Sequence, residues 1–343
     1  MSFSKYAAWA SLFIAVVFIS TLWAEDINLA LYYFVWSFQV FIICILLDSF
    51  IDSEKRLNFI LKCIIIGGGL LAARLLIEIP FNQWGTGRLG RGIDYNPNTL
   101  GLRLAFASLV STYFMVKVAT KKYIYFLSSI LLVTVSMFTG SRKVFVVLVV
   151  GYLLFLLFFG SFKKSYIKKL PFIVLIGTLM LILIFNFGPL YDVLGSRVES
   201  TFNAFTGNEI NNSESETQLR TAMIIEGLNL FQNSPLIGYG IGNFEEVSSY
   251  GTYSHNNYIE MLTGMGIIGF IVYYSFYCYL LFKLGSGILS GNKKFVLPFT
   301  IICLMFINET AIVSYQSLYT QILIMLSFVF VRIYNSENRN QRE

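Results

Sequence analysis

The sequence predicts an all-α integral membrane protein with about ten transmembrane helices, and three observations support that prediction. Of the 343 residues, 56% are hydrophobic and only 13% are charged, whereas a soluble domain carries roughly 25% charged residues. The apolar residues gather in runs of about 17–25 residues, the length that a helix needs to cross a bilayer. The basic residues stand mostly in the segments between these runs, as expected of a multi-span protein.

The order of the apolar runs gives the expected organisation of the chain. We expect a seven-helix membrane region (1–188), a long external loop (189–255), a three-helix membrane region (256–334) and a cytoplasmic tail (335–343). The first run should remain an uncleaved helix, because Leu22-Trp23-Ala24 is a poor cleavage site. The expected spans are 6–24, 29–51, 57–80, 98–118, 123–139, 143–162, 170–188, 256–282, 295–312 and 316–334.

The basic residues predict that both termini are cytoplasmic. With the N-terminus inside, the inner segments hold 17 of the 25 lysines and arginines, and the outer segments hold six. Lysine outnumbers arginine 13 to 4 inside, whereas arginine outnumbers lysine 5 to 1 outside. Topology needs only positive charge, so the outer arginines need another reason. Guanidinium groups bind phosphate bidentately, and that chemistry is one such reason.

Several other classes of site are not expected from the composition. The net charge of +6 is scattered over short loops without an aromatic and basic surface, so we expect no nucleic acid partner. The four cysteines lie inside apolar runs, without the spacing of a disulfide framework or a zinc site. No carboxylate cluster with metal-ligand spacing is evident, so no metal site and no metal cofactor are expected.

The loop 189–255 is long enough to be functional, and part of it should be helical. Ser215 and Gln218 could form a capping box that starts a helix near 217–232, which Asn233-Ser234-Pro235 should end. The glycine run that follows, Gly238-Tyr239-Gly240-Ile241-Gly242, lacks the strand and βαβ unit of a nucleotide-binding loop. We expect it to form tight turns that pack against the membrane surface.

The single histidine, His255, stands in the polar cluster Ser254-His255-Asn256-Asn257-Tyr258, at the expected start of a helix. A neutral imidazole could act as a base near neutral pH, and its cation could hold a phosphate group. The start of a helix also favours a nearby anion. A purely structural polar contact is the alternative interpretation of a lone histidine. Arg74 and Glu78, four residues apart, are expected to form an ion pair within their helix.

Four groups of residues on the expected outer side resemble motifs of the O-antigen polymerase and O-antigen ligase family. His255 is followed by ten residues, Gly266, two residues and Gly269. Arg220 precedes Asn233-Ser234-Pro235-Leu236-Ile237-Gly238-Tyr239-Gly240, and Ser141-Arg142 stands at a helix start. Asn96-Pro97-Asn98-Thr99-Leu100-Gly101 precedes an early helix. The resemblance extends from about residue 96 to 270, with Val146 where some members have leucine. The chain is shorter than many members of the family.

The resemblance implies a membrane glycosyltransferase, similar in fold to GT-C-type enzymes, at the periplasmic face of a bacterial inner membrane. The donor would be an oligosaccharide on undecaprenyl pyrophosphate, and the other partners would be the growing glycan chain, membrane lipid and a chain-length regulator. Arg142 and Arg220 would hold the pyrophosphate, and His255 would assist on a phosphate oxygen or as the base. Fixed guanidinium groups would take the place of a metal at the leaving group.

Further residues are candidates for substrate contacts, and several alternatives stay open. Arg142 could instead be an interfacial anchor, and Arg220 could pair with an acidic residue of its loop. Glu226 or Glu260 could serve as the base. The expected function is a polymerase that joins repeat units into O-antigen or capsular polysaccharide; the alternatives are a ligase, a polysaccharide-lipid transporter and a non-enzymatic scaffold. The substrate-binding candidates are Arg88, Arg91, Arg103, Tyr253 and Asn256.

Overall fold

The computed structural model describes residues 4–91, 95–118, 120–159, 182, 184–199 and 214–340. The side chains of residues 214–217 and 335–340 are not described. Within these ranges the regular structure is helical and no strand is present, in agreement with the predicted all-α fold. Short helical turns at Phe81–Gln83, Gly188–Leu190, Tyr191–Gly195, Phe244–Val247 and Lys293–Phe295 connect the longer helices.

Six helices in the described part of the chain are long and apolar enough to cross a membrane. They are α1 with the turn that follows it (Lys5–Trp23), α2 (Ile27–Phe50), α3 (Glu54–Glu78), α4 (Pro97–Lys117), α6 (Arg142–Phe159) and α12 (Asn257–Leu289). The chain is therefore a multi-pass helical membrane protein.

Three further apolar helices coincide with expected spans but are shorter or less apolar. They are α5 (Lys122–Met137), α13 (Val296–Glu309) and α14 (Leu318–Asn340), whose apolar part ends at Tyr334. Most of the expected span 170–188 lies outside the described residues. The number of ten spans, the orientation and the division into membrane regions and loop stay predictions.

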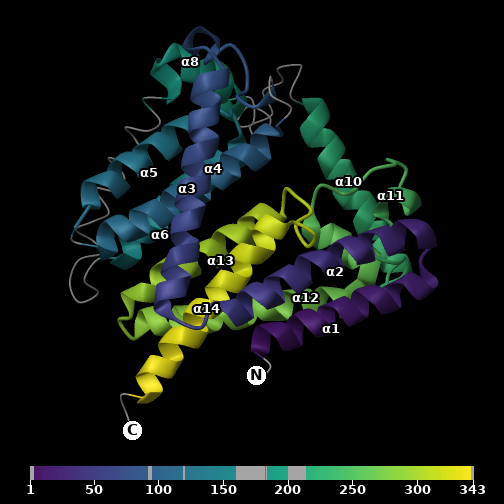
Figure 1. Cartoon of the computed structure of the whole chain (residues 1–343). Helices are drawn as coiled ribbons and strands as arrows, with labels where there is room; N and C mark the ends of the chain where they lie inside the picture. The colour runs from purple at the N-terminus through teal and green to yellow at the C-terminus, as the bar shows by residue number, and fades with distance from the viewer. Residues whose placement is uncertain are drawn as a thin grey trace. The chain divides into compact units, whose positions relative to one another are not determined.

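The chain folds into two compact units, and each is built from segments that are distant in sequence. The first unit comprises residues 1–57, 215–290 and 301–343, and the second comprises residues 58–214 and 291–300. In the first unit, α1 packs against both α2 and α12, and these three helices lie side by side (Figure 1). Aromatic side chains fill this contact. The rings of Trp9 and Phe276 are stacked with centroids 4.6 Å apart, and Phe13 lies 5.0 Å from Tyr273.

A buried ion pair closes the first unit at the end of α2. The Asp48 carboxylate, 1% exposed, lies 2.7 Å from the Arg332 guanidinium on α14. The same guanidinium donates to the backbone oxygens of Asp48 and Ile51 at 2.7 and 2.5 Å, and the Ser4 hydroxyl donates to the Asp48 carboxylate. A buried charge is costly unless it is paired and hydrogen-bonded, and these contacts meet that need.

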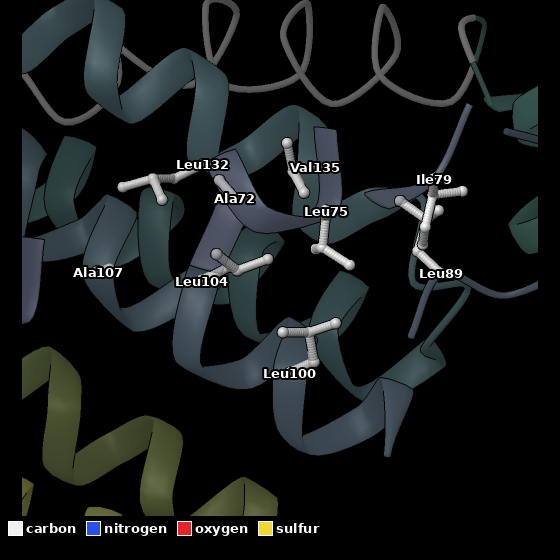
Figure 2. Packing of buried hydrophobic residues seen from close by; sticks show 9 residues of the cluster. All are labelled: Ala72, Leu75, Ile79, Leu89, Leu100, Leu104, Ala107, Leu132 and Val135. Carbon is white, nitrogen blue, oxygen red and sulfur yellow. The ribbon is translucent and has the colours of Figure 1, made fainter. Parts of the chain in front are cut away.

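In the second unit, α3, α4 and α5 enclose an apolar core. Figure 2 shows Ala72 and Leu75 of α3 facing Leu104 of α4 and Leu132 of α5. Hydroxyl groups add hydrogen bonds between neighbouring helices: Ser111 donates to the backbone oxygen of Tyr125 at 2.8 Å. Such contacts stabilise helix pairs in a bilayer, where lipid is as apolar as the side chains.

Among the three glycines of Gly67-Gly68-Gly69, only Gly68 is required by a close approach of helices. A Cβ at residue 68 would lie 2.6 Å from the Cβ of Ala107, whereas a Cβ at residue 67 would meet nothing within 4 Å. We predict that Gly68→Ala lowers the free energy of unfolding by about 1–3 kcal/mol, because α3 must move away from α4.

Gly67→Ala is the matched control, and its effect should stay within about 0.5 kcal/mol. Thermal unfolding of both variants in detergent, followed by circular dichroism, measures the difference. Equal unfolding temperatures for the two variants would show that the contact between α3 and α4 at Gly68 can accept a methyl group.

Candidate functional site

The cluster around His255 lies in the first unit, where α12 begins. Asn256 caps the helix: its side-chain oxygen accepts hydrogen bonds from the backbone N–H groups of Tyr258 and Ile259 at 3.0 and 3.3 Å. Asn256 is 9% exposed. The structure thus gives Asn256 a capping role, and its expected contact with substrate stays a prediction.

His255 itself has a backbone conformation that residues other than glycine seldom adopt. Its φ is 55°, in the left-handed region, where the backbone of a residue with a Cβ atom is strained. Its ring is half-buried and lies 4.2 Å from the ring of Tyr253, centroid to centroid. Strained residues that a fold holds in place are frequent at functional sites, so this turn marks His255 as a candidate.

Two charged groups lie close enough to Tyr253 to shift its pKa. Burial raises the pKa of the Tyr253 hydroxyl above its ordinary value, the positive charge of Arg220 lowers that pKa, and the negative charge of Glu260 raises it. Arg220 stands on α10 (Glu214–Asn233) and Glu260 in the first turn of α12. The structure therefore brings together three residues predicted from the sequence, Arg220, Tyr253 and His255.

The acidic residues near this cluster have different surroundings. Both carboxylate oxygens of Glu226 accept hydrogen bonds from Ser249, one from its N–H at 2.6 Å and one from its hydroxyl at 2.7 Å. Glu260 is 1% exposed and contacts Ser254, the residue immediately before His255. Of the two carboxylates that the sequence left open, Glu260 is the one adjacent to the histidine turn.

A break in α12 explains the glycine spacing that follows His255. Gly266 has φ 59° and ψ −164° inside an otherwise continuous helix. The segment 235–240 fills the break with four backbone hydrogen bonds. Ile267 and Ile268 donate to Pro235 and Leu236 at 2.8 and 3.3 Å. Tyr239 and Gly240 donate to Thr263 and Gly264 at 2.9 and 2.8 Å. The backbone groups released by the break thus have partners within the protein, as a broken membrane helix requires.

The glycine-rich residues 238–243, which overlap the segment 235–240, also contact the turn between α1 and α2 and the start of α2. The Asn243 side chain accepts from the N–H of Asp26 at 2.6 Å, and Tyr239 accepts from the N–H of Glu25 at 3.3 Å. A Cβ at Gly242 would lie 2.0 Å from the ring of Tyr33. The prediction of tight turns is correct, since Gly238, Gly240 and Gly242 all have positive φ. Their packing partners are α12, α2 and the α1–α2 turn of the protein itself.

The other predicted site residues belong to the second unit. Arg142 is the first residue of α6, after the buried Ser141, and Arg103 is half-buried within α4. Arg88 donates to the backbone oxygen of Thr139 at 3.0 Å and to the Asn98 side chain at 2.6 Å. These bonds give Arg88 a role in holding the turn between α5 and α6.

A pocket of about 270 Å³ lies beside Arg88, at the end of α3. Its polar lining comes from Glu78, Gln83, Thr86, Arg88 and Arg91. Arg91 is exposed, and Glu78 forms the expected ion pair with Arg74 at 2.8 Å. Charged and hydrogen-bonding groups around a small cavity are suited to a sugar or a phosphate.

Sequence reasoning missed one polar cluster of the first unit. Glu309 at the end of α13 is 1% exposed and accepts hydrogen bonds from Tyr274 at 3.1 Å and Tyr277 at 2.7 Å. Asn257 donates to the Tyr274 hydroxyl at 3.0 Å and accepts from the N–H of Ser314 at 2.9 Å, which ties the start of α12 to this cluster. An acidic residue inside an apolar run was the available signal.

Comparison with known proteins defines the class more closely. The apolar helices define a multi-pass helical membrane protein, and its arginine and histidine residues form a candidate anion-binding site. Residues 127–274 match a family model described as O-antigen ligase. This match confirms the resemblance to the O-antigen polymerase and ligase family, whose members are glycosyltransferase-like enzymes. No curated protein matches the chain. Within the described residues, no group of three or more His, Cys, Asp or Glu side chains is placed to hold a metal ion.

The break in α12 leads to a prediction about Gly266. A Cβ at residue 266 would lie 2.4 Å from the backbone carbonyl of Leu236, in addition to the strain of a positive φ. We expect Gly266→Ala to cost more than about 3 kcal/mol of unfolding free energy. Gly251 has a similar φ of 58°, but a Cβ there would meet no atom within 4 Å, so Gly251→Ala isolates the strain, about 1–2 kcal/mol. Thermal unfolding in detergent measures the loss of stability in both variants. A loss in Gly266→Ala no larger than that in Gly251→Ala would mean that the segment 235–240 can move to make room for a Cβ.

Arg88 and Arg91 should differ in what their removal does. Arg88→Ala should lower the free energy of unfolding by about 1–3 kcal/mol, since it removes two hydrogen bonds from a charged donor. Arg91→Ala should change it by no more than about 0.5 kcal/mol, because its side chain is exposed. Unfolding temperatures of the two purified variants decide this prediction, which fails if Arg91→Ala is the more damaging change.

Proposed function

We propose that this protein is a polymerase that joins oligosaccharide repeat units, carried on undecaprenyl pyrophosphate, into an O-antigen or capsular polysaccharide. The reaction would take place at the outer face of a bacterial inner membrane. The family match supports this class of chemistry, and the excess of arginine over lysine in the expected outer segments supports the side.

One observation carries the assignment of the site. The only histidine of the chain stands in a strained turn at the start of α12, against Tyr253 and beside the charges of Arg220 and Glu260. Such a turn holds the imidazole in a fixed place, and a fixed place is what a group needs to act on a phosphate oxygen or a hydroxyl proton.

The chemistry follows from the charges that develop. An acceptor sugar hydroxyl attacks the anomeric carbon of the donor, the bond from that carbon to the pyrophosphate oxygen breaks, and the hydroxyl proton is lost to a base. Negative charge grows on the leaving pyrophosphate. The guanidinium of Arg220 would stabilise it, and the resemblance assigns the same role to Arg142. His255 would bind a phosphate oxygen or take the proton. No metal is required in this scheme.

The substrate-binding residues follow the same logic. The exposed face of Tyr253 would pack against a sugar ring, because aromatic faces bind the apolar face of sugars. The pocket beside Arg91 would bind a phosphate or sugar group. Arg88 would stabilise the wall of this pocket through its hydrogen bonds to Thr139 and Asn98. The membrane lipid, the growing chain and a chain-length regulator are the other proposed partners.

A ligase that transfers finished glycan to lipid A core or to a protein is the second candidate, because the family match is described as O-antigen ligase. The two enzymes share the donor and differ in the acceptor. A surface-glycan gel distinguishes them. Loss of a polymerase leaves core with a single repeat unit, and loss of a ligase leaves bare core while lipid-linked polymer accumulates.

We predict that cells lacking the gene show core with one repeat unit, and that the wild-type gene restores the ladder of long chains. Arg142→Ala, Arg220→Ala and His255→Ala should each fail to restore it, with at least a roughly hundredfold loss of polymer, as expected when a group that stabilises the transition state is removed. The amount of each variant in the membrane is measured in parallel by immunoblot.

Arg56→Ala is the matched control for loss of an arginine. Arg56 forms an exposed ion pair with Asp52 at 2.7 Å, and exposed pairs contribute little to stability, so this variant should restore the ladder. If the ladder survives deletion of the gene, the glycan assignment is wrong. If all three site variants restore it fully, the assignment of the site is wrong.

A further inference from the structure

The turn at His255 is held by a carboxylate from the next turn of helix. One oxygen of Glu260 accepts from the backbone N–H of Ser254 at 2.9 Å and from the Ser254 hydroxyl at 2.7 Å. Glu260 and Ser254 are each 1% exposed, so water does not compete for these hydrogen bonds. A buried carboxylate that accepts from two donors binds them more strongly than a neutral acceptor would.

The residues on both sides of His255 are also bonded to each other. The Ser254 hydroxyl oxygen accepts from the N–H of Asn256 at 3.3 Å, and Asn256 caps α12. The Asn256 backbone oxygen, 2.8 Å from the same hydroxyl, is a second acceptor for its one proton. His255 therefore projects from a closed loop whose two ends are fixed by Ser254 and Asn256. The positive φ of His255 is unfavourable without such contacts. Glu260 holds Ser254 and belongs to α12, so it ties this loop to the helix in addition to the Asn256 cap.

A second glutamate in the same unit also accepts from the N–H and the hydroxyl of one serine, without this consequence. Glu226 accepts from the N–H and the hydroxyl of Ser249 at 2.6 and 2.7 Å. Ser249 is six residues before His255 and does not border the strained turn. The two glutamate–serine contacts thus involve the same two donor groups of a serine, and they differ in position, in burial and in the number of carboxylate oxygens that accept.

We propose that Glu260 is a positioning residue for His255: it maintains the left-handed turn that presents the imidazole, through its two hydrogen bonds to Ser254. This proposal rests on the proposed function for the use of His255 in catalysis, but the positioning itself can be measured without any substrate. Glu260 takes no proton from the acceptor in this scheme and acts only through His255.

The full-length protein offers a direct probe, because His255 is its only histidine. Diethyl pyrocarbonate converts an imidazole into a carbethoxy derivative with its own absorbance, so the rate of that change in detergent reports on His255 alone. We expect Glu260→Ala to raise the rate roughly tenfold, since the loss of hydrogen bonds to a charged acceptor frees the turn. Glu260→Gln, which retains an acceptor oxygen, should give a smaller increase.

Ser254→Ala tests the same contact from the other side. It removes the hydroxyl and keeps Glu260 in place, so it serves as the deciding variant if Glu260→Ala does not fold. Its rate should lie between those of wild type and Glu260→Ala. Glu226→Ala is the matched control, and its rate should equal that of wild type. Folding of every variant is verified by circular dichroism and gel filtration.

The proposal is overturned if folded Ser254→Ala and Glu260→Gln both react at the wild-type rate, or if Glu226→Ala accelerates the reaction as much as they do. Failure of the proposed function is a separate result. In that case the imidazole would still become more reactive in the Glu260 variants, while His255→Ala would restore a full glycan ladder. A falling kcat with an unchanged donor KM in Glu260→Gln would connect the two, because it marks an effect on the transition state alone.

Discussion

The backbone pairing between the segment 235–240 and the break in α12 is the constraint on which the first unit depends. A helix in a bilayer cannot leave N–H and C=O groups without partners, so a break at Gly266 is possible only where another segment supplies them. The segment 235–240 supplies them with four hydrogen bonds. Tyr239 of this segment and the nearby Asn243 also contact the turn between α1 and α2. The end of α10, the start of α2 and both halves of α12 are thereby joined at one place.

This arrangement accounts for the order of residues in the loop. Close contact of two backbones excludes side chains, which explains why Gly238 faces Thr263 and Gly264, and why Gly266 faces Leu236. Because the segment is fixed on α12, the chain between it and the helix has a limited path. Tyr253 and His255 lie on that path, Glu260 stands in the first turn of α12 beside them, and the charge of Arg220 acts on Tyr253 from α10. The glycines contribute no chemistry themselves, but they set the position of the residues that could.

The sequence was sufficient for local features and insufficient for those that depend on distant partners. Apolar runs identified the helices, Asn233-Ser234-Pro235 correctly ended α10, and the Arg74–Glu78 pair formed as its spacing indicates. The break at Gly266 was hidden, because the apolar run through 256–282 continues across it and nothing local identifies the segment that fills it. Arg88 looked like a ligand for phosphate, and only the fold reveals its bonds to Thr139 and Asn98. The burial of Glu260 likewise arises from packing, which periodicity alone does not describe.

The ion pair between Asp48 and Arg332 has a consequence for synthesis of the chain. The ribosome completes α2 long before α14, so the Asp48 carboxylate must wait for the Arg332 guanidinium until α14 has been made. During that interval an acidic group at the end of a membrane helix has to remain hydrated or neutral. Synthesis of α14 therefore supplies the guanidinium that completes this end of the first unit. A chain that stops before α14 would leave the Asp48 carboxylate without this guanidinium and would expose the apolar surface of α2 and α12 that α14 covers.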